Sequence, residues 1–290
     1  MSNSGAWLTA GPADDPLIVL RSDFWGYNSI GIIGEDSACA VDPGVRPGEL
    51  TRLRRSLETR RGQRLVSNVV LTHSHHDHIR GWQAFPGARI SMPQVAAEKP
   101  AQARQRILAA VRAIDEHLAV TAPEFTYPLV DEAFDEMLAF DLGRCPVEVH
   151  FLPGHSNCTS VVHLPSCKTL LTADYLVMPG LPYCRWEVES HEDALRTLLR
   201  WCGEWGVERI VPAHNEILQG ERLRAAILED LEYFAVLREV VASELACGRD
   251  RESAVRRAAK RMGVRRGRDI GGRRRQDLDN ARRVLGVLGN

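Results

Sequence analysis

The sequence predicts an α/β fold with an inserted helical segment and a helical C-terminal extension. Three observations predict it. Short β-rich segments alternate with helical ones, an Ala-, Gln- and Arg-rich segment interrupts them, and helical periodicity continues to the C-terminus. With 290 residues, 44% of them hydrophobic, the chain can bury one large core. We therefore expect a main domain at 1–218 with an insertion at about 93–122, and an extension at 219–290.

The first β segments predict an antiparallel meander. LIVL at 17–20, NSIGIIG at 28–34 and ACAV at 38–41 are separated by turn residues, and the third ends in Asp42-Pro43-Gly44.

A helix, a buried strand and a second helix are expected next. Segment 47–61 has leucines at helical spacing, and LVSNVVL at 65–71 has the length and β-branched content of a buried strand. The second helix is predicted from near Asp77 to Phe85, before a strand at 88–92.

The insertion has apolar residues at spacings of three and four, which predicts one or two amphipathic helices. An acidic, hairpin-like stretch follows at 130–140. The remaining expected elements are strands at 147–152, 159–164, 168–172 and 207–211, and a helix at 191–205.

Charge and composition exclude several classes of partner. The net charge is −1, although residues 251–290 carry thirteen Lys and Arg against four Asp and Glu, which we interpret as a solvated helical face. No basic leader and no run of about 18 apolar residues is present. We expect a cytoplasmic protein that binds neither membrane nor nucleic acid. Its seven cysteines form no C-x-x-C pair and should be reduced and mostly buried.

The segment Thr72-His73-Ser74-His75-His76-Asp77-His78 directly follows the strand at 65–71. His155, Asp174 and His214 each follow another predicted strand. Imidazole and carboxylate ligands suit zinc, manganese or iron, and the motif has no thiolate of the kind that closes structural zinc sites. The pattern predicts a catalytic metal site at strand ends. Surface or packing roles are assigned to His117, His150, His163 and His191, and His76 is left out of the ligand set.

The ordered motifs H-x-H-x-D-H, P-G-H-[ST], a strand ending in Asp and a late Pro-x-His resemble those of the metallo-β-lactamase superfamily over about residues 17–218. The resemblance implies a four-layer αββα sandwich, and Asp42 resembles an early strand-end Asp that supports the ligands. It implies two Zn²⁺, with Mn²⁺ or Fe as alternatives. The first metal would be held by His73, His75 and His155, the second by Asp77, His78 and His214, with Asp174 bridging them.

Two cations about 3.5–4 Å apart would share a water and lower its pKa toward ~7, which makes a bridging hydroxide the nucleophile. Asp77 and Asp174 are the expected catalytic carboxylates. Asp174 stands where β-lactamases of this fold usually have Cys, and LPGHS, LTADYL and VPAHN resemble segments of glyoxalase II, acyl thioesterases and lactonases.

We therefore expect hydrolysis of a thioester, ester or lactone carbonyl in a small-molecule or acyl-carrier-linked substrate. Two alternatives stay open: a mononuclear iron, persulfide dioxygenase-like oxidoreductase, and a phosphodiesterase or nuclease with the basic tail as a binding arm. The oligomeric state also stays open, with a homodimer as one alternative.

Three positions depart from the family's pattern, which favours a divergent substrate. Ala173 and Ala213 replace the glycines usual before two of the ligands, and Asn157-Cys158 replaces a Gly-rich continuation. Aromatic residues near the motifs are candidates for the substrate pocket. They are Trp25, Tyr27, Tyr175, Tyr183 and Trp186.

Overall fold

The structure is a computed structural model. It describes residues 7–10, 15–59, 65–120, 124–265 and 273–288. The chain divides into two compact units. The first contains residues 1–152, 158–173 and 211–215, and the second contains residues 153–157, 174–210 and 216–290.

The first unit contains a seven-stranded sheet in chain order, β1 to β7. Its strands are β1 (Trp7–Ala10), β2 (Leu17–Arg21), β3 (Asn28–Ile33), β4 (Ala38–Val41), β5 (Val66–Val70), β6 (Arg89–Pro93) and β7 (Glu132–Phe134). Strands β1 to β4 are antiparallel, which confirms the predicted meander. Strands β4 to β7 are parallel, because each connection between them crosses back over the sheet.

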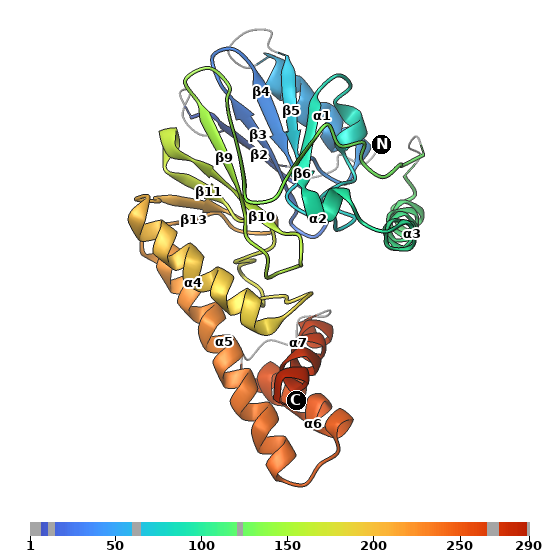
Figure 1. Cartoon of the computed structure of the whole chain (residues 1–290), viewed down its shortest axis with the longest axis vertical. Helices are drawn as coiled ribbons and strands as arrows, with labels where there is room; N and C mark the ends of the chain where they lie inside the picture. The colour runs from blue at the N-terminus through green and yellow to red at the C-terminus, as the bar shows by residue number, and fades with distance from the viewer. Residues whose placement is uncertain (1–6, 11–14, 60–64, 121–123, 266–272, 289–290) are drawn as a thin grey trace. The chain divides into compact units, whose positions relative to one another are not determined.

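Helices α1 (Pro47–Thr59) and α2 (Gln94–Ala97) contact strands of this sheet, and α3 (Ala101–His117) lies farther from the sheet (Figure 1). Helix α1 buries Leu50, Leu53 and Leu57 against it, as the leucine spacing predicts. A Cβ atom at Gly31 would lie 2.5 Å from Leu57 Cδ2, so a glycine there lets the helix approach the sheet. Helices α2 and α3 confirm the predicted helical insertion, of which residues 121 and 122 lie outside the described residues.

The helix expected from Asp77 to Phe85 is wrong. This segment consists of turns and one short 3₁₀ helix, η1 (Trp82–Ala84). A Cβ atom at Gly81 would lie 2.1 Å from the carbonyl oxygen of Pro43, so the backbone is packed against the loop that follows β4. This tertiary contact overrides the local helical pattern.

A second sheet contains the antiparallel strands β8 (Met137–Asp141), β9 (Pro146–Phe151), β10 (Ser160–Leu164) and β11 (Thr169–Leu171). It lies beside the first sheet in Figure 1. The hairpin expected at 130–140 is wrong, because β7 pairs with β6 whereas β8 pairs with β9. The chain therefore passes from the first sheet to the second between β7 and β8. The alternation of apolar residues is the same whether two strands pair with each other or belong to different sheets, so the pattern could not distinguish these arrangements.

The second unit is mainly helical. It contains α4 (Val188–Glu204), most of β12 (Arg209–Val211), β13 (Leu218–Gln219), α5 (Glu221–Ala246), α6 (Arg251–Arg265) and α7 (Arg273–Leu288). Helix α5 packs against α4, α6 and α7, which confirms the helical C-terminal extension. Arg238 of α5 contacts both carboxylate oxygens of Glu192 in α4, at 2.8 Å for Nη1–Oε1.

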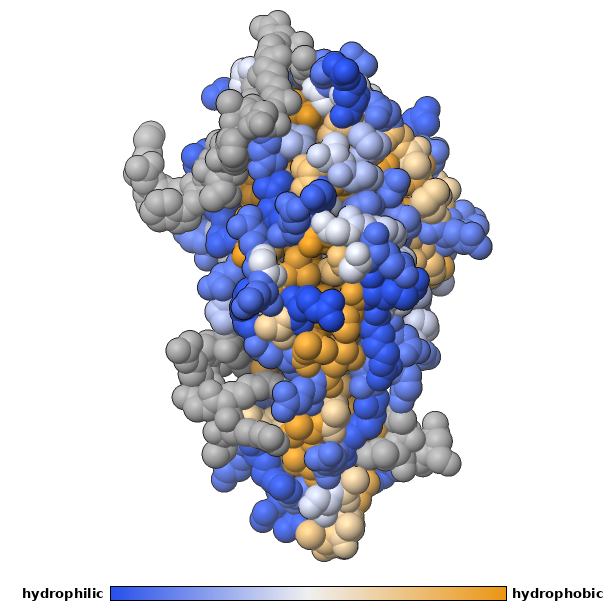
Figure 2. Space-filling view, turned by 90° about the vertical axis from the view of Figure 1, so that its left-hand side faces the viewer, coloured by the Kyte–Doolittle hydropathy of each residue, from blue (hydrophilic) through white to orange (hydrophobic). Residues whose placement is uncertain are grey.

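Many arginines of the C-terminal helices are paired within their own unit. Arg249 and Arg261 contact Glu244, and Arg282 contacts Glu252. Figure 2 shows hydrophilic residues flanking a strip of hydrophobic ones on the side where α4 and α5 lie in Figure 1. Part of the basic tail, 266–272, lies outside the described residues. Among the described helices, none combines the length and hydropathy of a membrane span.

Candidate metal centre

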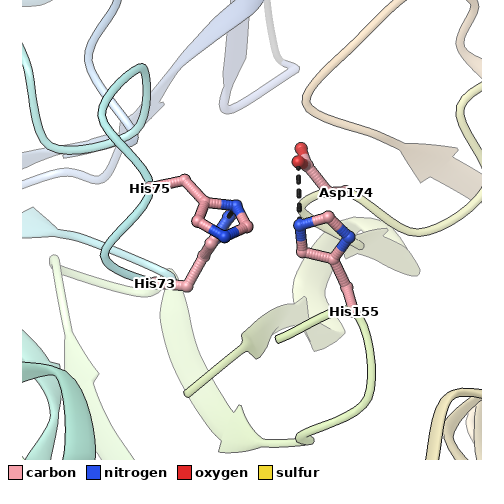
Figure 3. Close-up of side chains that lie close together, drawn as sticks. All are labelled: His73, His75, His155 and Asp174. Carbon is pink, nitrogen blue, oxygen red and sulfur yellow. Dashed lines mark hydrogen bonds and ion pairs between the residues drawn. The ribbon is translucent and has the colours of Figure 1, made fainter. Parts of the chain in front are cut away.

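Strand β5 leads directly into the histidine-rich loop. His73 is fully buried, and its Nδ1 lies 3.0 Å from Thr72 Oγ1. Its Nε2 lies 2.9 Å from Nδ1 of His75, so the two imidazoles present nitrogen atoms to one point (Figure 3). Ser160 Oγ and backbone N both donate to Thr72 O, which fixes the start of this loop to β10.

Asp77, His78 and His214 form a second group in the first unit. One ligand atom from each lies within 4.8 Å of the other two. His214 Nε2 is 3.4 Å and His78 Nε2 is 3.9 Å from Asp77 Oδ2. The other nitrogens are held by the protein: His78 Nδ1 lies 2.8 Å from Asp42 Oδ2, and His214 Nδ1 lies 3.1 Å from Trp25 O.

Asp42 is almost completely buried and supports the loop as well as His78. Its Oδ1 accepts a hydrogen bond from Thr72 N at 2.8 Å, and its Oδ2 accepts one from Thr72 Oγ1 at 2.6 Å. Tyr27 Oη donates to the backbone oxygen of Asp42 at 3.0 Å. The residue expected from the resemblance to support the ligands therefore contacts one of them.

His155 and Asp174 are brought together in the second unit, where His155 Nε2 lies 3.2 Å from Asp174 Oδ2 (Figure 3). His155 Nδ1 lies 2.7 Å from the carbonyl oxygen of Tyr183, and His155 N donates to Tyr175 Oη at 2.9 Å. A Cβ atom at Gly154 would lie 2.6 Å from Tyr175 Oη, which explains the glycine before this histidine. Burial raises the pKa of Tyr175, so its hydroxyl stays neutral.

These contacts fit metal ligands. A histidine that binds a metal usually has its other ring nitrogen fixed by a carboxylate or carbonyl group. His78, His155 and His214 each have Nδ1 beside such an oxygen and Nε2 beside an aspartate. The set of imidazoles and carboxylates suits a divalent transition metal such as zinc.

The two alanine departures differ in their backbone conformation. Ala173 has a φ of 50°, in the left-handed region that favours glycine, whereas Ala213 is not among the residues with positive φ. The left-handed backbone at this position therefore explains why a glycine is usual before the residue that corresponds to Asp174. The replacement of glycine by Ala213 carries no such strain.

The five aromatic pocket candidates fall into different environments. Tyr27 and Tyr175 are 0% exposed, and their hydroxyl groups contact the backbone of Asp42 and His155, respectively. Trp25 is 48% exposed, and its ring centroid lies 5.9 Å from that of His76. Tyr183 donates to Asp279 Oδ2 on α7, and Trp186 O accepts from Arg283.

Sequence patterns missed part of this site. Thr72 has an identifiable signal, because it is a polar residue directly before the first ligand and its hydroxyl contacts both His73 and Asp42. The carbonyl groups of Trp25 and Tyr183 have none, since every residue carries a carbonyl and only the folded chain selects these two.

Similar proteins support the fold and the family. A model of the Metallo-beta-lactamase superfamily matches residues 23–214. A hydroxyacylglutathione hydrolase from Ruegeria pomeroyi is 33% identical over 121 residues, which cover 42% of this chain and only 38% of that protein.

Solved structures show the same fold at low identity. A metallo-β-lactamase from Pontibacter korlensis has a TM-score of 0.56 at 19% identity and covers 78% of this chain and 99% of its own. The sec-alkylsulfatase Pisa1 from Pseudomonas sp. has a TM-score of 0.67 at 15% identity and covers 98% of this chain and 50% of its own. They confirm the predicted α/β fold class. Because the family match covers more than half of its length, the chain belongs to the metallo-β-lactamase superfamily.

Proposed function

We propose that this protein is a metal-dependent hydrolase that breaks the bond between the carbonyl carbon and the sulfur or oxygen leaving group of a thioester, ester or lactone. The observation that carries the proposal is the orientation of His78, His155 and His214. Each has one ring nitrogen beside a protein oxygen and the other beside a catalytic carboxylate. Such orientation is what a metal ligand needs, and a histidine that serves only packing does not need it.

We further propose a dinuclear centre with the ligands that the family resemblance implies. His73, His75 and His155 would hold one Zn²⁺, Asp77, His78 and His214 the other, and Asp174 would bridge them. The match to the superfamily model supports this assignment, because residues 23–214 contain all seven positions in the order of the family's motifs.

When bound, two divalent cations would supply the Lewis acidity that makes water nucleophilic near neutral pH and polarises a carbonyl oxygen. The protein's own contribution is positioning. Asp77 Oδ2 lies beside the imidazoles of His78 and His214, so this carboxylate is placed to accept a hydrogen bond from the attacking water at the centre. Asp42 and the carbonyl group of Trp25 keep these imidazoles in place while charge develops on the substrate.

Two observations support a carbonyl substrate. Asp174 rather than Cys follows β11, and the relative from Ruegeria pomeroyi is named a hydroxyacylglutathione hydrolase. The exposed indole of Trp25 lies next to the ligand loop, where it can contact an apolar acyl group. We propose that Trp25 contributes to selection for the acyl part of the substrate.

The first test compares His75→Ala with His76→Ala. These neighbouring histidines have the same chemistry, but they differ in position. His75 Nδ1 lies 2.9 Å from Nε2 of His73 and belongs to a group of side chains that could hold a metal, whereas His76 Nδ1 lies 3.4 Å from Asp77 Oδ1 and belongs to no such group among the described residues. We expect His75→Ala to lose metal and hydrolysis together, and His76→Ala to keep the metal content of the unchanged protein. Equal metal content in the two variants would contradict the assignment.

The second test is a substrate panel: a thioester, an ester, a lactone, a β-lactam, a phosphodiester and a secondary alkyl sulfate. We expect turnover of at least one of the first three, abolished by a chelator and restored by Zn²⁺. Turnover of the phosphodiester alone or of the sulfate alone would contradict this proposal and indicate a phosphodiesterase or a sulfatase instead. One iron per chain with consumption of oxygen would instead show a dioxygenase.

A further inference from the structure

Another group of ligand-type side chains lies on the second sheet. Glu148 and His150 are two residues apart on β9, so both point to the same face. His163 on β10 is the register partner of Glu148, which places it on that face as well. None of these three residues belongs to the strand-end centre described above.

The geometry of this group is that of metal ligands. Glu148 Oε2 lies 2.9 Å from His163 Nδ1 and 3.5 Å from His150 Nε2. One ligand atom from each residue lies within 4.8 Å of the other two. The side chains of His163 and His150 are only 7% and 17% exposed, and that of Glu148 is 35% exposed.

A cross-strand hydrogen bond alone does not account for this arrangement. It would require one imidazole at the carboxylate, whereas ring nitrogens of both His150 and His163 converge on the same oxygen, Oε2 of Glu148. Two imidazoles and one carboxylate meeting at one point are a common set of protein ligands for a divalent transition metal, with water completing the coordination.

The protonation states also suit a metal. Burial lowers the pKa of His150, which favours the neutral imidazole that can bind a metal. Partial burial alone would raise the pKa of Glu148, but hydrogen bonds from His163 and His150 leave it below its usual value.

We propose that Glu148, His150 and His163 form a further metal site, which takes one divalent transition-metal ion of the Zn²⁺ type. The ion joins β9 to β10, so its expected role is to stabilise the second sheet. This inference is independent of the proposed hydrolysis, since it rests on residues that the strand-end centre does not use.

The test uses the full chain with His73→Ala and His78→Ala, which weaken the strand-end centre. In this background, equilibrium dialysis with Zn²⁺ alone should show one bound ion, and Zn²⁺ should raise the melting temperature. Both effects should disappear when the further substitution His150→Ala is introduced. His117→Ala, at an exposed position on α3, is the matched control and should keep both. Zinc retained by other strand-end ligands is the same in both proteins and cancels in the comparison.

A gain-of-binding variant tests the site even if His150→Ala does not fold. Met137 on β8 is the register partner of His150 and is 54% exposed. Met137→His would add a fourth ligand, a third imidazole, about 5 Å from His150, measured between Cβ atoms. We expect Zn²⁺ to bind at least about tenfold more tightly than in the control Met137→Leu, on the scale at which orienting contacts change metal affinity.

Two results would overturn the proposal. One is equal zinc content and equal thermal response with and without His150. The other is equal zinc affinity of Met137→His and Met137→Leu. Either would show that the three side chains are only a hydrogen-bonded cluster between strands.

Discussion

The carboxylate of Asp42 lies 2.8 Å from Nδ1 of His78, although 36 residues separate them in the sequence. The same carboxylate accepts hydrogen bonds from the backbone and the hydroxyl group of Thr72. Asp42 therefore fixes both the start of the ligand loop and the ring nitrogen that His78 presents toward Asp77. The positions of the candidate ligands therefore depend on Asp42, a residue that is not among the seven proposed ligands.

Asp42→Asn should weaken metal binding without removing a ligand. An amide keeps the size of the side chain but removes the negative charge that orients His78 and raises its basicity. We expect the affinity of the group containing Asp77, His78 and His214 to fall by about 10–100-fold. Zinc competition with a chelator measures it, and Asp141→Asn, an exposed aspartate, is the control. Unchanged affinity would show that Asp42 serves only the backbone of the loop.

Ala173→Gly should relieve strain next to Asp174. A left-handed alanine costs about 1–2 kcal/mol, and the greater freedom of glycine in the unfolded chain offsets about 0.4–1 kcal/mol of the gain. We expect the free energy of unfolding to stay equal or rise by up to about 1 kcal/mol, measured by chemical denaturation.

The control is Ala226→Gly, at a buried position within helix α5. It should lower the free energy of unfolding by about 0.5–1 kcal/mol, because glycine is unfavourable inside a helix. Equal losses in the two variants would contradict the role assigned to the backbone at Ala173.

Arg238→Ala should destabilise the second unit. Glu192 is only 4% exposed, and without Arg238 its buried charge loses its partner in α5. The expected loss in the free energy of unfolding is about 3 kcal/mol. Arg200→Ala breaks an exposed pair with Glu204 on α4 and should cost at most about 0.5 kcal/mol. Similar losses from both variants would mean that the Glu192 pair behaves as a surface pair.

The pH dependence of stability should change in Glu244→Gln. The hydrogen bond from Arg261 lowers the pKa of Glu244, and attraction by Arg249 adds to it. A carboxylate whose pKa is lower in the folded state stabilises the protein above its unfolded pKa, about 4.3, and this contribution disappears as the pH falls through the folded value.

At pH 7 we therefore expect Glu244→Gln to melt at a lower temperature than the unchanged protein. Below about pH 4.3 the difference should shrink. Melting curves between pH 3 and 7 check it, with the exposed Glu239→Gln on the same helix as the control. A difference in melting temperature that does not vary with pH would contradict the predicted linkage.

Local patterns predicted most of the fold. The meander, helix α1 and the helical insertion follow from hydrophobic spacing, because short-range periodicity reports which side of an element is buried. The predictions of two elements were wrong for the same reason, because tertiary contacts decided their structure. The turns around Gly81 are imposed by contact with Pro43, and the separation of β7 from β8 is decided by partners in two different sheets.

The candidate site shows the same division. The sequence by itself determined the metal-binding chemistry, because the types and order of the ligands at His73, Asp174 and His214 are properties of the chain. Only the tertiary structure decided which ring nitrogen each histidine presents and which carbonyl groups, those of Trp25 and Tyr183, hold it. It also brought His150 and His163 to one oxygen of Glu148, where the sequence indicated only surface or packing roles. The physical reason is that hydrogen bonds are short and directional, so their partners depend on backbone positions that distant segments fix.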